Sequence, residues 1–351
     1  MFNPERVELV RRRLALTKIG FADKLGIDRK ALYRFEADEA ELPADARGKL
    51  LSLSQYPEDF FLKSSPEYPN PDCVSFRSLR SLTAGARDAA IAAGAIAFEL
   101  DDWVSSEYKL PEHDVFLDRE LPPEESAMRL RVIWNIGLRP ISNMVNLLEA
   151  HGVRVFSLVE ETRHLDAYSL WRNDKPYVFL NTTKTAERSR FDAAHELAHL
   201  VLHRHVGSSH PSAEVEADAF ASAFLMPQDD LKAEIRFVRS VKDIINYKIR
   251  WGVSAMALAY RLHKLKRISD WHYRSYCIEL SKEGRDKEPN PMKRETSQVW
   301  MKILTDMWKR GISISRLSRR LAIPEKEINS LLFGIATQMA REEPKPLRLV
   351  D

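Results

Sequence analysis

The sequence of 351 residues predicts a predominantly helical α+β fold. Apolar residues recur at helical spacing through most of the chain. Only three short runs, at 153–156, 167–170 and 177–180, have the β-branched and aromatic character of strands. A helix expected at 188–203 follows the third run. We therefore predict a domain with a small sheet, placed between two helical regions.

Changes in composition divide the chain into four predicted regions. Proline-rich stretches at 66–71 and 121–123 mark two of the boundaries. Amphipathic patterns predict a long alanine-rich helix at 83–108 and further helices at 124–134 and 141–150. The predicted regions are a helical bundle at 1–62, a linker and connecting helix at 63–120, the domain with the small sheet at 121–231, and a basic helical C-terminal region at 232–351.

Charge is distributed unevenly although the net charge is only +3. Residues 232–351 hold 26 Lys and Arg against 14 Asp and Glu, which favours contact with nucleic acid or an acidic partner. Two cysteines far apart, without a CxxC pattern, indicate neither a disulfide framework nor a thiolate zinc site. The charged N-terminus does not resemble a secretory signal, and the longest apolar run, 89–98, is too short to span a bilayer. We expect a cytoplasmic protein with no membrane partner.

The first 62 residues have the pattern of a helix-turn-helix. Gly26 suits a left-handed turn between two short helices, and Asp28 can cap the second of them. This segment resembles the phage-repressor-like (XRE) family. The resemblance implies that the helix beginning near Asp28 enters the major groove of DNA. The exposed candidates for DNA contact are Arg29, Lys30, Tyr33 and Arg34.

Docking of a protein is the alternative role for this bundle. Residues 1–62 contain eleven basic and eleven acidic residues, a poor match to the charge of DNA. The basic residues gather in 4–34, where nine basic residues face four acidic ones. Lys18 replaces the glutamine that often begins the second helix in the repressor-like family, which removes a usual phosphate contact.

The sequence HELAH at 195–199 places two imidazoles and a carboxylate on one helix. Because four residues make slightly more than one turn, His195 and His199 project from one face and can bind one ion. Zinc accepts imidazole nitrogen, and a glutamate beside its open position can take a proton from water. We therefore predict a zinc site with Glu196 as the catalytic base.

A catalytic zinc usually has a third protein ligand. His205 lies ten residues after His195, the spacing of the HExxHxxGxxH enzymes. That motif has a glycine where the helix ends, but Leu202 stands at this position and resists the required turn. His203 lies roughly 12 Å along the helix from His195, beyond a shared coordination sphere. Neither histidine is the expected ligand.

A second amphipathic helix at 214–225 offers acidic ligands. Glu214 and Asp218 are four residues apart and share one face, the ExxxD arrangement of glutamate zincins. We expect Glu214 to complete a His₂Glu site and Asp218 to hold a ligand histidine by its other ring nitrogen. Glu216 is the alternative ligand.

Two segments, 188–203 around HELAH and EVEADAFASAFLMP at 214–227, together resemble the ImmA/IrrE family of zinc metallopeptidases. The stretches 147–153 and 166–169 also resemble this family, and the similarity covers roughly 121–230. The resemblance implies a gluzincin-like metallopeptidase domain, bound zinc and proteolysis of a transcriptional repressor or stress regulator. Many relatives carry a repressor-like domain in front of the peptidase.

The predicted function is that of a zinc metalloendopeptidase coupled to a DNA-binding module, with a transcriptional regulator as protein substrate and a homodimer as one expected assembly. The competing hypothesis is a DNA-binding regulator, or a toxin–antitoxin component, whose metal domain senses or scaffolds without cutting. An extended substrate is expected to pair with the strand at 177–180. His210, Tyr168 and Arg190 are the open candidates for oxyanion stabilisation.

The C-terminal region carries a second pattern of the same kind. Residues 22–35 align with 318–331 at one constant offset, which predicts a second helix-turn-helix-like unit at 314–332 with Arg316, Arg319, Arg320 and Lys326 nearby. Basic and aromatic residues also interleave at 261–276, a composition that can bind single strands but more often forms a solvated surface. DNA contact by this region is a further expectation.

Overall fold

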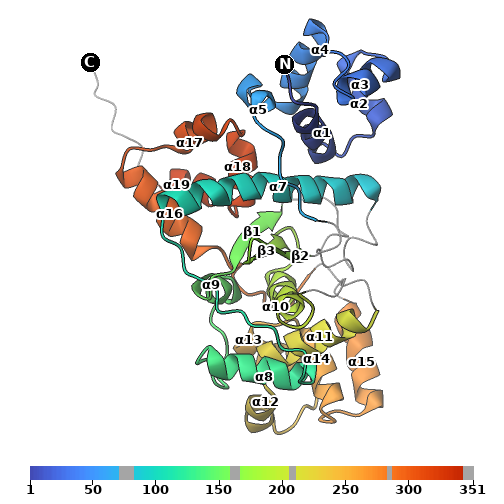
Figure 1. The fold of residues 1–351 in the computed structure, drawn as a ribbon. Coiled ribbons are helices and arrows are strands. Elements are labelled where there is room, and N and C mark those ends of the chain that lie inside the picture. Colours follow the sequence, from blue (N-terminus) through green and yellow to red (C-terminus); the bar gives the residue numbers. More distant parts are fainter. Residues whose placement is uncertain (71–82, 159–166, 205–210, 283–286, 343–351) are drawn as a thin grey trace, which may run out of the picture.

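The computed structural model describes residues 1–70, 83–158, 167–204, 211–282 and 287–342. These residues form many helices and one three-stranded sheet, which confirms the predicted α+β class (Figure 1). Within the described ranges, none of the helices combines the length and the apolar character needed to cross a bilayer.

The N-terminal bundle is built from short capped helices. Thr17 caps α2 (Lys18–Leu25), which ends at Gly26 with φ +69°. Asp28 accepts a hydrogen bond from the Ala31 N–H at 2.6 Å and so caps the next helix. Phe21 and Leu32 pack between the helices. The helices are α1 (Pro4–Arg13), α2 (Lys18–Leu25), α3 (Arg29–Glu36), α4 (Ala44–Ser54) and α5 (Glu58–Leu62).

The long helix α7 (Ala84–Glu107) lies between this bundle and the sheet (Figure 1). Its small residues allow a close approach. A Cβ on Gly94 would lie 2.6 Å from the hydroxyl of Tyr168, which donates a hydrogen bond to the Ala90 carbonyl at 3.0 Å. The alanine-rich helix expected from the sequence therefore fits directly against the sheet.

The sheet contains β1 (Arg154–Leu158), β2 (Ala167–Arg172) and β3 (Lys175–Asn181) in the order β1-β3-β2. β1 is parallel to β3, and β2 is antiparallel to it. Alternate residues of β3 face different cores, because Tyr177 and Phe179 lie on the α7 side whereas Val178 and Leu180 lie on the opposite side. The sheet thus separates two hydrophobic cores.

Each core has its own helices. The core on the α7 side includes the N-terminal bundle and α16 (Gln298–Lys309), α17 (Ile314–Leu321), α18 (Glu325–Leu331) and α19 (Ile335–Glu342). The helices around the other core are α8 (Pro123–Ile133), α9 (Met144–Ala150), α10 (Ala186–Leu202), α11 (Pro211–Leu225), α12 (Gln228–Glu234), α13 (Val241–Trp251), α14 (Ala255–Lys264) and α15 (Asp270–Ser281). Helices α12 to α15 therefore share a core with α10 and α11.

Helices α17 and α18 repeat the geometry of α2 and α3. The offset that carries Lys18–Leu25 onto Ile314–Leu321 also places Ala322, with φ +49°, at the position of Gly26. Unlike α3, helix α18 packs against β1, where the Ser157 hydroxyl donates to the Ser330 carbonyl. Glu327 of α18 also pairs with Arg13 of α1 at 2.6 Å. Helix α18 is therefore anchored to β1 and α1, with only Glu325 and Lys326 of the helix exposed.

Candidate metal centre

The two helices that carry the predicted ligands pack directly against each other. Thr185 caps α10 by accepting a hydrogen bond from the Arg188 N–H, and the following residues bury an apolar surface under the sheet. His195 and His199 lie one turn apart on the side of α10 that contacts α11. Helix α11 places Glu214 opposite them.

Three ligand atoms converge at this contact. The Nε2 atoms of His195 and His199 are 3.1 Å apart. Glu214 places Oε2 3.3 Å from Nε2 of His195 and Oε1 3.7 Å from Nε2 of His199. Tetrahedral zinc with bonds of 2.0–2.2 Å separates its ligand atoms by about 3.3–3.6 Å. The spacing of the three side chains therefore fits one tetrahedral cation.

The electrostatics of the cluster also favour a cation. His195 is 9% exposed, and burial by itself would lower the pKa of its ring. Hydrogen bonds with Asp218 and Glu214 outweigh burial and raise the pKa of His195 to about 10. A site that holds a proton so firmly is one where a metal ion can take the place of that proton.

The second ring nitrogen of each histidine also has a partner. Nδ1 of His195 lies 2.9 Å from Asp218 Oδ1, the contact expected from the sequence. Nδ1 of His199 lies 3.1 Å from Nδ1 of His203, whose Nε2 is 3.0 Å from Glu216 Oε2. These contacts favour N–H at Nδ1 of both ligand histidines, so that both Nε2 atoms can bind a cation once it displaces the second proton of His195.

The alternative ligands considered from the sequence lie elsewhere. Glu216 contacts His203 and does not belong to the converging group, which consists of His195, His199 and Glu214 within the described ranges. His203 lines up behind His199 as the helix geometry predicts. His205 lies outside the described residues.

Glu196 is buried beside the triad and has a fixed orientation. The Ser169 hydroxyl of β2 donates a hydrogen bond to Glu196 Oε2 at 2.6 Å. Sequence reasoning did not identify Ser169. The sequence does contain a signal for Ser169, because this serine stands in a buried strand between Tyr168 and Leu170. A buried hydroxyl there needs a hydrogen-bond partner.

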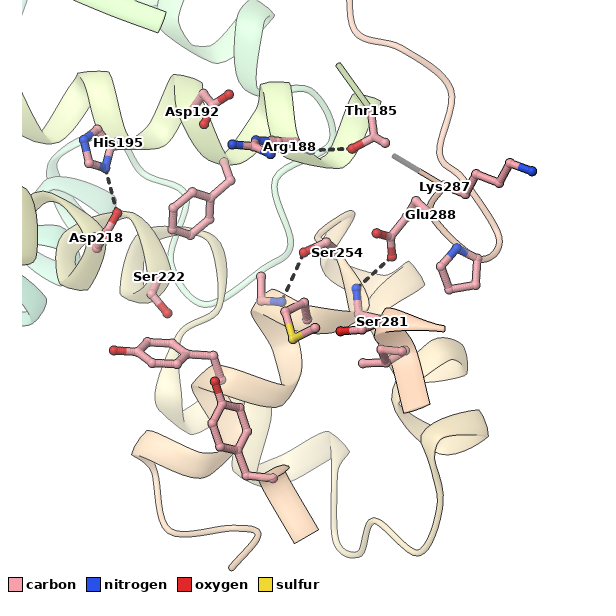
Figure 2. Close-up of a pocket in the computed structure, with 18 of the residues that line it drawn as sticks. Thr185, Arg188, Asp192, His195, Asp218, Ser222, Ser254, Ser281, Lys287 and Glu288 are labelled. Atoms are coloured by element: carbon pink, nitrogen blue, oxygen red, sulfur yellow. Dashed lines mark hydrogen bonds and ion pairs between the residues drawn. The ribbon is translucent and has the colours of Figure 1, made fainter. Parts of the chain in front are cut away.

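A cavity of about 770 Å³ lies beside the cluster. Figure 2 shows His195 and Asp218 on one side of it, with Ser254 and Ser281 across from them. The opposite wall comes from α14 and α15, including Tyr260. Sequence reasoning placed these helices in a basic C-terminal region and did not connect them with the site.

Asp192 also lines the cavity. Burial raises the pKa of its carboxyl to about 6, above the usual 3.8. No hydrogen-bond partner for its Oδ2 is found among the described side chains and backbone groups. Its protonated form is therefore favoured near neutral pH more than that of an ordinary aspartate.

Two of the candidates for oxyanion stabilisation have structural roles. Tyr168 is fully buried and donates to the Ala90 carbonyl, and Arg190 pairs with Glu295 and the Ile141 carbonyl. His210 lies outside the described residues. The expectation that a substrate pairs with 177–180 is wrong, because β3 already has β1 on one side and β2 on the other.

The candidates for DNA contact lie on α3, on the side of α7 away from α10 and α11 (Figure 1). Arg29, Lys30, Tyr33 and Arg34 are all exposed, while Leu32 on the same helix is buried. The Arg29 guanidinium donates to the Tyr33 hydroxyl at 3.0 Å. The basic and aromatic face of α3 is thus open to solvent.

An HExxH helix with a converging glutamate beside a cavity defines a metallopeptidase-like site. Comparison with known families agrees with this class, since residues 148–263 match the IrrE N-terminal-like domain of the peptidase M78 family, a metal-dependent family. The matched segment includes the sheet, α10 and α11. A search of curated proteins gives no match to the chain.

Proposed function

We propose that this protein is a zinc-dependent metalloendopeptidase with a gluzincin-like site, coupled to a DNA-binding module. One observation carries the peptidase assignment. Glu196 lies beside the converging His195, His199 and Glu214 at the wall of a large cavity, within a segment similar to a peptidase family. The donor set of two imidazoles and a carboxylate suits zinc in a hydrolytic site.

The chemistry follows from the residues around the cavity. A zinc ion held by His195, His199 and Glu214 would supply a Lewis acid to the peptide carbonyl. Glu196 accepts a proton from the attacking water at its carboxylate and returns it to the leaving amine. Ser169 holds one carboxylate oxygen of Glu196, so the base is oriented before substrate arrives.

The helical bundle at 1–62 is proposed to bind DNA through α3, and the substrate is proposed to be a transcriptional repressor or stress regulator. Support for DNA contact comes from the exposed Arg29, Lys30, Tyr33 and Arg34 and from the capped turn at Gly26. An Arg29→Ala, Arg34→Ala protein should lose affinity for selected duplexes and show a weaker salt dependence. Retained affinity would favour a bundle that docks protein.

The peptidase assignment is tested with Glu196→Gln. This variant should bind one zinc per chain, as measured by metal analysis, and should fail to cleave an unstructured peptide library, as measured by mass spectrometry. Glu125→Gln, an exposed residue of α8, is the matched control and should cleave like the wild type. If Glu196→Gln cleaves as well as the wild type, or regulates transcription normally, the protease hypothesis fails and a metal sensor remains.

A further inference from the structure

A second cavity lies between the end of α7 and the helices α16 and α17. These helices lie on the opposite side of the sheet from α10 and α11 (Figure 1). Its volume is about 310 Å³. The lining combines aromatic side chains such as Trp103, apolar side chains such as Leu317, and three arginines that include Arg316. Concave sites of this size and mixed lining are typical of small-molecule binding.

The arginines outnumber the nearby carboxylates. Arg320 pairs with Glu107 at 2.7 Å, and Arg310 pairs with Asp306 at 3.4 Å. Arg316 is exposed and has no carboxylate partner within the described ranges. Each guanidinium has five N–H donors, so the two paired arginines keep donors for a further acceptor. The cavity therefore carries an excess positive charge.

The indole of Trp103 forms an aromatic part of the lining. Trp103 is 9% exposed, and its Nε1–H has no hydrogen-bond partner among the described residues. Because the Nε1 atom is itself buried, other atoms of the indole ring line the cavity, and these are what a ligand there can contact.

We propose that this cavity binds a small organic anion with a planar or apolar body. Arg316, supported by Arg310 and Arg320, holds the anionic group. Leu317 and the aromatic rings contact the body. A nucleic-acid backbone would instead follow an extended row of cations on a convex or grooved surface. The proposal does not depend on peptidase activity.

This site gives a role to the second helix-turn-helix-like unit. Helix α18, the counterpart of α3, contacts β1 and α1, and only Glu325 and Lys326 of this helix are exposed. Helix α17, the counterpart of α2, turns Arg316 and Arg320 toward the cavity instead. Of the four basic residues noted near 314–332, Arg316 and Arg320 thus line this cavity.

The test uses the full chain and the probe 8-anilinonaphthalene-1-sulfonate, an anion on an aromatic body. Wild-type protein should show a saturable site by fluorescence titration. Arg316→Gln should raise the Kd about tenfold or more, because it removes a charge-assisted contact. Arg319→Gln, an exposed residue of the same helix outside the cavity lining, is the matched control and should leave the Kd unchanged.

Thermal unfolding of each variant verifies that the fold is kept. Displacement of the probe by adenosine monophosphate supports the small-molecule site. Displacement by short duplex DNA without displacement by adenosine monophosphate overturns it in favour of a nucleic-acid contact. The absence of saturable binding to the wild type, or an equal effect of Arg316→Gln and Arg319→Gln, also overturns it.

Discussion

Removal of the Asp218 carboxylate should weaken zinc binding by about tenfold. Asp218 Oδ1 lies 2.9 Å from Nδ1 of His195 and orients that ring toward the other two ligands. Loss of such a partner costs about 10–100-fold in metal affinity. The Asp218 side chain is 41% exposed, so solvent screens part of its charge. We therefore expect Asp218→Ala to lose zinc affinity near the lower end of this range, about tenfold or about 1.4 kcal/mol of binding free energy.

Two variants of Asp218 and one control separate the orientation of the His195 ring from the negative charge of the Asp218 carboxylate. Asp218→Asn keeps an oxygen that can accept from the His195 N–H, so its affinity for zinc should fall only about threefold. Asp229→Asn removes one exposed carboxylate without touching the site and serves as the control for net charge. Competition with a chromophoric chelator at fixed pH and salt gives the affinities. Unchanged affinity in Asp218→Ala, or an equal loss in Asp229→Asn, would refute the assigned orientation.

Three further predictions concern stability, pH and catalysis. Lys248→Met should lower the free energy of unfolding by about 3–5 kcal/mol, because its buried ammonium contacts two carboxylates at 3.0 Å, whereas the exposed Lys242→Met should change little in urea titrations. The pKa of Asp192 is about 6 in the folded protein, so the free energy of unfolding should fall as pH rises from about 4 to 6. Asp192→Asn should abolish this fall and raise the free energy of unfolding by up to about 3 kcal/mol at pH 7. An unchanged pH profile in this variant would contradict the prediction. Ser169→Ala should lower kcat about tenfold with zinc content unchanged, since Glu196 loses its 2.6 Å contact, and an unaltered kcat would exclude this role.

Features confined to one element could be predicted from the sequence. The spacing of His195 and His199, and that of Glu214 and Asp218, is a property of a single helix, and the structure brings these two pairs together. The turn at Gly26 and its repeat at Ala322 also followed from local patterns. Each of these needs only backbone geometry and a few neighbouring residues.

Features that depend on contacts between distant segments were missed. Local alternation identified the strands but not their order, so β3 was wrongly expected to be free for a substrate. Ser169 meets Glu196 only because β2 lies on α10, and the cavity wall beyond Asp218 comes from helices near residues 255–281. Similarly, nothing in the local pattern of α18 shows that β1 covers it.

The division of the sheet between two cores has a practical consequence for expressing parts of this protein. A fragment limited to 148–263, the segment with family similarity, would lose α7 and α16 and leave Phe156, Tyr177 and Phe179 without cover. Such a contiguous aromatic surface promotes aggregation in water. A shortened protein intended for crystallisation or assay should therefore begin before α7 and extend through α19.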